Sequence, residues 1–398
     1  MHLSKGNLNM KSENDFSRRA FTIIELLVVV SIISLLIAIL LPAIGKAKDG
    51  ALITQSLGNL NNMSKANFAY AADWADRHFT AIPDDAGQVQ GSCAAYVATV
   101  ACPSQQLLGF DSTGGLWGYW VAGALCPQGV GQCGNWQVLL PMVWSAPGSG
   151  GPGNATNPYT NSFGAHEMLN TKAFNSYMNG RFYDKVFFAP KDRIGLQSCD
   201  YGLQSEGEYT SNPTNNQQIS FPTYFWSPSN MIPPTAHASN VRDCTNAGKQ
   251  NLLGPGGYRS PLMGMAVFPD QKTLVIEKLW LQNKQGPELN LNFATPRNWL
   301  FNEGYNSSPA CLFLDGHVQL CGMNTAINDD KRASVQNASN AGMCANGKGL
   351  WHRGTPCGAN GWYTTGSGYD PLVDMKPTSF HMLTTDGILG RDILKAGN

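Results

Sequence analysis

The sequence carries little charge and no excess of either sign. Asp, Glu, Lys and Arg make up 14% of its 398 residues, with 27 basic against 27 acidic side chains, whereas about a quarter is usual. Without a basic field the chain has no means of concentrating a polyanion, so the composition argues against a nucleic-acid partner. Glycine is abundant, with 43 residues, and aromatic residues reach 10%. This balance is typical of a loop-rich, strand-containing secreted domain.

Motifs of catalysis and metal binding are also missing. The seven histidines are scattered, and the chain has no HExxH, GxSxG, phosphate-binding loop or dinucleotide fingerprint. We therefore expect no catalytic residues, no metal site and no cofactor, in a protein that is not an enzyme. Structural calcium is the alternative left open, because carboxylates occur at 315–318, 328–331 and 384–392. None of these segments has the ligand density of a calcium loop.

The cysteines are even in number and none forms a CxxC pair. Zinc sites usually need such close pairs, so we expect disulfides formed in an oxidising compartment, with buried free thiols as the simpler alternative. The connectivity does not follow from the spacing. The ten cysteines are Cys93, Cys102, Cys126, Cys133, Cys199, Cys244, Cys311, Cys321, Cys344 and Cys357.

One long apolar run stands near the N-terminus. Its central part, "LLVVVSIISLLIAILL", contains only two polar residues, both serines, whose hydroxyls can bond back to helix carbonyls. A helix over residues 21–44 would be about 36 Å long, enough to cross a bilayer core. Ordinary secretory signals have shorter cores. We therefore expect a retained transmembrane helix, with cleavage after "GKA" (45–47) as the alternative.

Glu25 interrupts the start of this run. An acid inside a membrane span is costly and is usually paired with a cation, yet no Lys or Arg lies between Phe21 and Pro42. The simpler explanation is an interfacial acid favoured by the dipole of a helix start. The alternative is a cut between Ala20 and Phe21, because the freed amino group of Phe21 would supply the missing charge.

The stretch "RRAFTIIELLVVVSIISLLIAILLP" resembles the processing and methylation segment of type IV prepilins and of the pseudopilins of type II secretion. The resemblance implies that a leader, residues 1–20, is removed by a membrane-embedded peptidase and that Phe21 becomes the N-methylated first residue. Glu25 is then the fifth residue of the mature chain, as in that family. Ala20 departs from the glycine that usually precedes the cut.

Pro42 removes a backbone hydrogen bond near the end of the run. It either kinks a continuing helix, which is its role in pilins, or ends the span, and the sequence favours neither. Residues 1–20 hold four basic and two acidic side chains, and Lys46, Lys48 and Asp49 follow the run. By the positive-inside rule the N-terminus is cytoplasmic. We expect a single-pass inner-membrane protein whose C-terminal domain is periplasmic or extracellular.

The rest of the chain is predicted to have an α+β fold, with an amphipathic helix over residues 45–80 packed on an antiparallel sheet of a loop-rich domain, 81–398. Apolar residues in the helix recur at roughly helical spacing. Between 84 and 165 we expect an insertion with short strands or helices. Trp226 and the other tryptophans could stack on sugars, but core packing is the more common use. Short β-branched or aromatic runs predict strands at 184–193, 220–228, 262–280 and 310–320.

Residues 184–325 are similar to a domain of prepilin-type proteins that is named for a His-x9-Asp-Gly motif. Asp315 and Gly316 supply the Asp-Gly pair, and Tyr305 stands where the histidine would fall. The resemblance implies that this part of the chain is the most regular part of a pilin-like outer domain.

The Asp-Gly pair at 315–316 lies between two apolar runs, which predicts a hairpin turn. A two-residue turn would place Cys311 opposite Leu320. A three-residue loop, 315–317, would place Cys311 opposite Cys321 and align the apolar side chains on one face. We favour the second register, which allows a cross-strand disulfide between Cys311 and Cys321.

These features predict a pilin-like or pseudopilin-like subunit that assembles through its N-terminal helix into a type IV pilus or a type II secretion pseudopilus. Its expected partners are the prepilin peptidase and methylase, the inner membrane, and other subunits whose Glu25 would pair with the Phe21 amine. The alternative is a membrane-tethered surface protein that uses the prepilin segment for export and binds a glycan or a protein.

Overall fold

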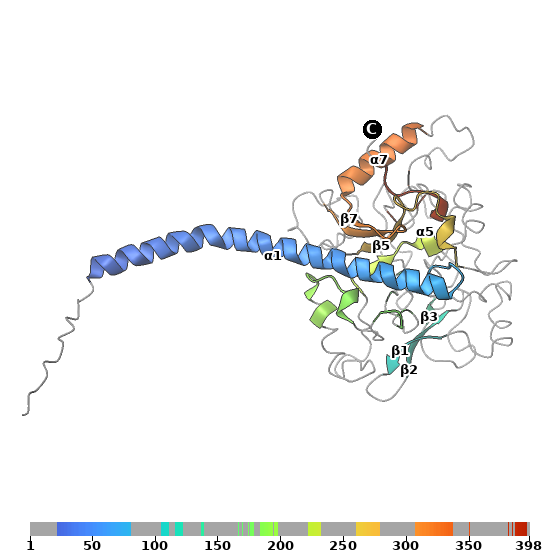
Figure 1. The fold of residues 1–398 in the computed structure, drawn as a ribbon, viewed down its shortest axis with the longest axis horizontal. Coiled ribbons are helices and arrows are strands. Elements are labelled where there is room, and N and C mark those ends of the chain that lie inside the picture. The colour runs from blue at the N-terminus through green and yellow to red at the C-terminus, as the bar shows by residue number, and fades with distance from the viewer. Residues whose placement is uncertain are drawn as a thin grey trace, which may run out of the picture. The chain divides into compact units, whose positions relative to one another are not determined.

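The computed structural model divides the chain into two compact units, Met1–Ala51 and Leu52–Asn398, and Figure 1 follows the chain by colour. The predicted leader, residues 1–20, and Phe21 lie outside the residues that the structure describes. Those described are 22–80, 166, 169, 174, 176–178, 184–193, 195–197, 222–231, 260–278, 307–336, 350, 381, 384 and 387–395, with strands also assigned at 105–110, 116–121 and 137–138.

The helix α1 (Ile23–Asp73) begins in the first unit and includes Pro42 within its length. Every residue from 22 to 51 is exposed. Among the described residues, α1 is the one helix long and apolar enough to cross a membrane, and its most apolar window has a mean hydropathy of 3.1. The predicted apolar helix is therefore present. Because α1 continues past Pro42, this residue does not end the helix, and the kink stays a prediction.

The part of α1 in the second unit has one buried face. Leu60, Met63, Asn67 and Ala71 recur at intervals of three and four residues and are at most 4% exposed, which is the periodicity of an amphipathic helix. The predicted helix over 45–80 is confirmed except at its end. It stops at Asp73, because the residues at 75 and 76 take left-handed backbone angles, with φ of 53° and 62°.

A four-stranded antiparallel sheet lies in the second unit, in the order β4-β5-β6-β7. All residues of its first three strands are buried, which accounts for apolar runs in place of an alternating pattern. The strands predicted within 220–228, 262–280 and 310–320 are confirmed, and so is the α+β class. The strands are β4 (Tyr224–Trp226), β5 (Thr273–Glu277), β6 (Ala310–Phe313) and β7 (Val318–Leu320).

The predicted strand at 184–193 is wrong. The chain forms a short 3₁₀ helix, η2 (Lys185–Phe187), because the side chain of Asp184 caps it by accepting a hydrogen bond from the Val186 N–H at 2.9 Å. Phe187 and Phe188 follow each other and are both at most 1% exposed. The apolar residues of this run are therefore buried in the core, although they lie in a tight turn and not in a strand. The other helical segments are α5 (Pro228–Met231), η3 (Met263–Met265), α7 (Met323–Gln336) and η5 (Gly387–Leu389).

Aromatic side chains from distant parts of the chain pack together in the core. The Trp226 ring lies 5.4 Å from that of Phe174 and 6.0 Å from that of Phe79, and the two phenylalanine rings are 4.9 Å apart. All three side chains are at most 2% exposed. Trp226 is therefore a core residue and offers no face to a sugar.

A second sheet lies within the predicted insertion. Its strands are ordered β1-β2-β3, with an antiparallel first pair and a parallel second pair. Tyr305 and all the cysteines except Cys311 and Cys321 lie outside the described residues, so expectations for them stay predictions. The strands are β1 (Gln105–Phe110), β2 (Leu116–Val121) and β3 (Gln137–Val138).

Candidate functional site

The start of α1 is closed by reciprocal hydrogen bonds between Thr22 and Glu25. The Thr22 hydroxyl accepts from the Glu25 N–H at 3.2 Å, and Glu25 Oε2 accepts from the Thr22 N–H and from the Thr22 hydroxyl, each at 2.9 Å. This is a capping box, which satisfies backbone donors that a helix start leaves unpaired. The Thr-x-x-Glu pattern is visible in the sequence, but its apolar surroundings point first to a membrane charge, and the capping box was not predicted.

Glu25 thus has a local structural role at the point where the mature chain would begin. Phe21, the predicted new N-terminus, directly precedes Thr22 in the sequence. The hydrogen bonds hold the carboxylate beside the first turn, where the helix dipole also favours negative charge. The site can therefore present an ordered anion next to residue 21.

The rest of the exposed part of α1 carries large apolar side chains. Between Ile23 and Ile44 their exposed fractions run from 45% at Val29 to 84% at Ile23. The hydroxyl of Ser31 is satisfied within the helix, because it donates to the Val28 carbonyl oxygen at 2.7 Å, as expected. An apolar surface of this extent suits contact with lipid or with other helices, and not with water.

The β6–β7 hairpin has a three-residue loop, but its register differs from both predicted ones. Cys311 pairs with Gln319. The Phe313 N–H donates to the His317 carbonyl oxygen at 3.0 Å, which closes a loop of residues 314–316. The favoured loop, one residue later, is therefore wrong, and so is the two-residue turn.

Gly316 explains the shift in register. Its φ is 90°, so it takes the last position of the loop, where a left-handed residue follows a turn and glycine is favoured. Asp315 supports the turn by accepting from the His317 N–H at 3.1 Å. A Cβ on Gly316 would also lie 3.0 Å from Ser64 Oγ and 3.1 Å from a ring carbon of Phe68. The turn at Asp315 and Gly316 is present, and it packs closely on α1.

The observed register separates the cysteines along the hairpin. Cys321 follows β7, and its N–H donates to the Pro309 carbonyl oxygen at 2.9 Å, whereas Cys311 lies opposite Gln319. Both cysteines are buried free thiols in the structure. The register that suggested a Cys311–Cys321 disulfide is wrong, and the disulfide stays a prediction.

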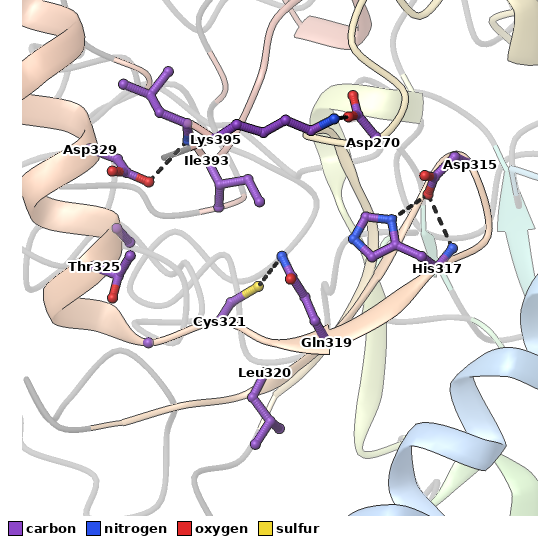
Figure 2. A pocket seen from close by; sticks show the side chains of 13 residues that line it. Asp270, Asp315, His317, Gln319, Leu320, Cys321, Thr325, Asp329, Ile393 and Lys395 are labelled. Atoms are coloured by element: carbon purple, nitrogen blue, oxygen red, sulfur yellow. Dashed lines mark hydrogen bonds and ion pairs between the residues drawn. The ribbon is translucent and has the colours of Figure 1, made fainter. Parts of the chain in front are cut away.

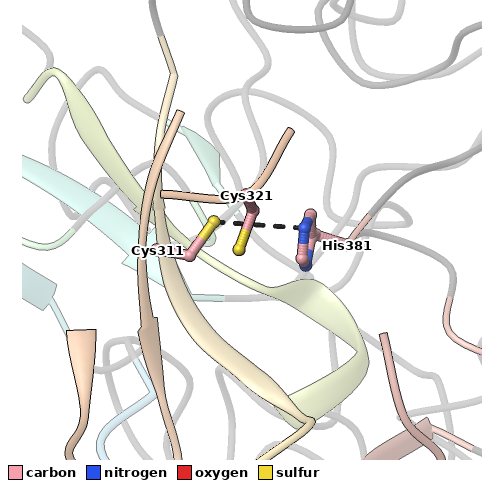
Figure 3. Close-up of side chains that lie close together, drawn as sticks. All are labelled: Cys311, Cys321 and His381. Carbon is pink, nitrogen blue, oxygen red and sulfur yellow. Dashed lines mark hydrogen bonds between the residues drawn. The ribbon is translucent and has the colours of Figure 1, made fainter. Parts of the chain in front are cut away.

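The two thiols nevertheless lie close together, and His381 joins them (Figure 3). One ligand atom from each of Cys311, Cys321 and His381 lies within 4.8 Å of the other two. The Cys311 Sγ is 4.0 Å from His381 Nε2, and none of the three residues is more than 5% exposed. The sequence brought the two cysteines together on the hairpin but did not point to His381, which lies 60 residues beyond Cys321 and belongs to no metal motif.

The surroundings treat the two thiols differently. Burial raises the pKa of Cys311, and its neighbour Cys321 raises it further. Burial acts on Cys321 in the same direction, but hydrogen bonds with Cys311 and His381 outweigh it and lower the pKa of Cys321 to about 6. Cys321 is therefore the more acidic of the two thiols.

A buried ion pair lies beside this cluster. Lys272 Nζ is 2.8 Å from Asp392 Oδ2, and neither side chain is exposed. Asp392 also accepts from the Thr273 N–H at 2.9 Å and from the Thr384 hydroxyl. Its Oδ2 is 4.0 Å from His381 Nδ1. Burial lowers the pKa of Lys272, although the nearby Asp392 carboxylate acts to raise it. For Asp392, burial acts to raise the pKa, but Lys272 and His381 outweigh it and lower the pKa.

A pocket of about 480 Å³ opens between the end of β7, α7 and residues 393–395 (Figure 2). Two of the segments considered for calcium contribute Asp315 and Asp329 to its lining. Asp315 is 2.6 Å from His317 Nδ1, and Asp329 accepts from the Leu394 N–H at 3.0 Å. These carboxylates are bound to protein donors, and Asp392 of the third segment is paired with a lysine, so the described residues give calcium no support.

Comparison with known proteins identifies the first segment alone. A family profile described as the prokaryotic N-terminal methylation motif matches residues 15–41, which include Ala20, Phe21 and Glu25. No curated protein and no solved structure matches the chain. The resemblance of residues 184–325 to the His-x9-Asp-Gly domain stays a prediction. The motif supports a type IV pilin-like protein with a structural role, which implies processing by a prepilin peptidase and assembly with other pilin subunits.

Proposed function

We propose that the chain is a pilin-like subunit that is anchored in the inner membrane and, after removal of residues 1–20, assembles through α1 into a type IV pilus or a type II secretion pseudopilus. The observation that carries this proposal is the exposed apolar part of α1. Its residues 23–41 lie within the match to the methylation motif, and Glu25 is in its first turn.

The apolar part of α1 needs a cover other than water. Lipid would cover it while the subunit rests in the membrane, and the same segment of neighbouring subunits would cover it in a filament. The hydrophobic gain from burial scales with the apolar area removed from water, and both environments supply it. A helix of this kind can pass from the bilayer into a helical bundle without an intermediate that exposes it to solvent.

Removal of the leader would create the charge that Glu25 lacks. A cut between Ala20 and Phe21 frees an amino group on Phe21, and residues 22–41 contain no other cation. The capping box keeps the carboxylate ordered at the helix start. Pairing between the Phe21 amine of one subunit and Glu25 of the next would then set their axial register, because an unpaired charge in an apolar bundle is penalised.

The location follows from the same elements. The positive charges of the leader would keep the N-terminus in the cytoplasm, where the peptidase and methylase act on pilins, and the unit beginning at Leu52 would lie in the periplasm or outside the cell. Pro42, inside α1, would loosen the helix by one backbone hydrogen bond at the membrane exit.

Intact mass and N-terminal sequencing of the detergent-extracted protein test the processing step. We expect a chain that starts with N-methylated Phe21. A chain that still starts at Met1 in cells with an active prepilin peptidase would contradict the proposal. Ala20→Gly restores the residue usual in pilins, so it should raise the processed fraction if Ala20 slows cleavage.

Co-isolation with the cell's other pilin subunits tests the charge pair. Glu25→Ala should insert and be processed but fail to assemble. Glu25→Gln removes the charge and keeps an oxygen that can accept in the capping box, so we expect it to fail as well. Thr22→Val is the matched control, because it removes the capping hydroxyl and keeps the charge, and it should assemble.

Two outcomes would contradict the proposal, the first its charge pair and the second the filament function itself. Normal incorporation of Glu25→Gln would refute the charge pair. A processed wild-type protein that never co-isolates with a pilin subunit or a secretion complex would favour the membrane-tethered surface protein.

A further inference from the structure

The cluster of Cys311, Cys321 and His381 contains the donor atoms of a metal site. The three side chains come from β6, from the residue that follows β7, and from a segment near the C-terminus. Their ligand atoms lie within 4.8 Å of one another in the core, and Figure 3 shows the two thiols and the imidazole close together. Thiolate and imidazole are the ligands that zinc prefers.

The hairpin register places the two cysteines on one face of the sheet. Cys311 lies opposite Gln319, and side chains alternate between faces along a strand. Cys321, two residues beyond Gln319, therefore points to the same side as Cys311. The pairing of Cys321 with Pro309 through a 2.9 Å backbone hydrogen bond holds this position. The hairpin thus pre-positions two sulfur ligands.

The imidazole of His381 is oriented for metal binding through Nε2. That atom faces Cys311 Sγ at 4.0 Å, while Nδ1 is within hydrogen-bonding distance of Thr273 Oγ1 and 4.0 Å from Asp392 Oδ2. Histidine ligands of metals usually donate their other ring N–H to such an oxygen, which fixes the ring. His381 also has a φ of 60°, a strained backbone for a non-glycine residue and one that the surroundings must enforce.

The distances are close to those of a zinc site. With Zn–S near 2.3 Å and Zn–N near 2.05 Å, tetrahedral geometry places two sulfurs about 3.8 Å apart and a sulfur and a nitrogen about 3.6 Å apart. The separations in the cluster reach at most 4.8 Å. The ligand atoms would therefore move inward by no more than about 1 Å, a change that small side-chain rotations supply.

The electrostatics of the core favour a divalent ion. Two thiolates and one Zn²⁺ together carry no net charge, whereas two thiolates and Cu⁺ would leave a negative charge in the core. Lys272 and Asp392 already balance each other. The buried carboxyl group of Glu277 acts electrostatically on Cys311, which further favours a cation.

We propose that Cys311, Cys321 and His381 bind one zinc ion, with Thr273 as the residue that positions the histidine. The ion would tie the β6–β7 hairpin to the C-terminal segment and so close a long loop, which stabilises the folded state. Three protein ligands leave the fourth position of a tetrahedral zinc to water or to a further ligand. This site is independent of filament assembly.

Zinc content of the full-length, detergent-extracted protein, reduced, loaded with Zn²⁺ and dialysed, tests the proposal. We expect the wild type to hold one zinc ion per chain more than Cys321→Ser, Cys311→Ser or His381→Ala. His317→Ala is the matched control, because this histidine lies on the same hairpin and is 37% exposed; it should keep the full zinc content. Thr273→Val should weaken zinc affinity about 10- to 100-fold.

Two spectroscopic readouts keep the test valid if a ligand variant folds poorly. Co²⁺ added to the reduced wild type should give the intense visible bands of a tetrahedral thiolate site, and X-ray absorption should show two sulfur ligands with nitrogen or oxygen completing the shell. A reduced, folded wild type that binds neither Zn²⁺ nor Co²⁺ beyond the level of Cys321→Ser would overturn the proposal, whether or not the isolated protein carries a Cys311–Cys321 disulfide.

Discussion

Soluble domains usually bury apolar side chains and expose charged ones, and each of the two units departs from one half of this rule. Residues 23–51 of α1 expose apolar side chains, whereas the second unit buries charged ones, among them Lys272, Asp392 and Glu277. The buried groups have internal partners: Lys272 pairs with Asp392 at 2.8 Å, and Glu277 accepts from the Ala310 N–H at 3.1 Å. No residue in the described part of the first unit is classed as buried. These buried charged groups of the second unit thus find partners within that unit, whereas the exposed apolar side chains of the first need lipid or neighbouring helices to cover them.

The strongest test of this difference places the same substitution in both parts of α1. Leu60 is 0% exposed and Leu36 is 53% exposed. Leu60→Asp should destabilise the second unit by at least about 4 kcal/mol, because it loses a core side chain and buries a charge without a partner. Leu36→Asp should leave that stability within about 0.5 kcal/mol. Thermal unfolding in detergent measures both.

Membrane fractionation completes the same comparison. A carboxylate at the centre of a span costs about 3 kcal/mol on insertion, so Leu36→Asp should reduce the membrane-bound fraction and Leu60→Asp should not act through the membrane. Equal losses of thermal stability in the two variants would mean that the exposed part of α1 is packed against its own domain, and the comparison would fail.

The sequence predicted the elements whose signals are local. The apolar run and the spacing of Leu60 and Met63 predicted α1. Apolar runs flanked by turns predicted β5 and the hairpin. The end of α1 was placed too late because left-handed residues such as Asp76 have no clear pattern. The segment after Asp184 was wrongly predicted as a strand. Two adjacent phenylalanines buried in a capped turn give the same apolar run in the sequence as a buried strand.

The contacts that depend on long-range register could not be predicted in the same way. A shift of one residue in the loop before His317 moved Cys311 from Cys321 to Gln319, although Gly316 could have indicated the loop through its preference for positive φ. The fold brings His381 next to the two thiols, and no local sequence pattern links it to them. The match to the methylation motif over residues 15–41, by contrast, depends on contiguous residues, and it agrees with the resemblance stated for residues 18–42.

The second test compares two ion pairs that differ in burial. Lys272 has an unexposed side chain and pairs with Asp392, whereas Lys395 is 70% exposed and pairs with Asp270. Lys272→Met should cost about 3–5 kcal/mol, because it leaves a carboxylate buried without its cation. Lys395→Met should cost less than about 1 kcal/mol. Chemical denaturation of metal-free protein separates these values.

A small effect of Lys272→Met would contradict the view that the second unit needs its buried charges paired. The double variant Lys272→Met with Asp392→Leu is the informative control. It removes both charges, so it should recover much of the lost stability, whereas a purely steric role of the lysine stem would give no recovery.

The smallest expected effects concern two glycines and have opposite signs. Gly316 has a φ of 90°, and a Cβ there would lie 3.0 Å from Ser64 Oγ, whereas a Cβ on Gly58, inside α1, would meet nothing within 4 Å. Gly316→Ala should cost about 1–3 kcal/mol, since alanine is strained at positive φ. Gly58→Ala should stabilise the second unit by about 0.5–1 kcal/mol, because alanine loses less backbone entropy in a helix. Gly316→Asn tests the cause, as asparagine tolerates left-handed backbone better than alanine; a cost equal to that of alanine would assign the effect to the contact with α1 instead of to φ.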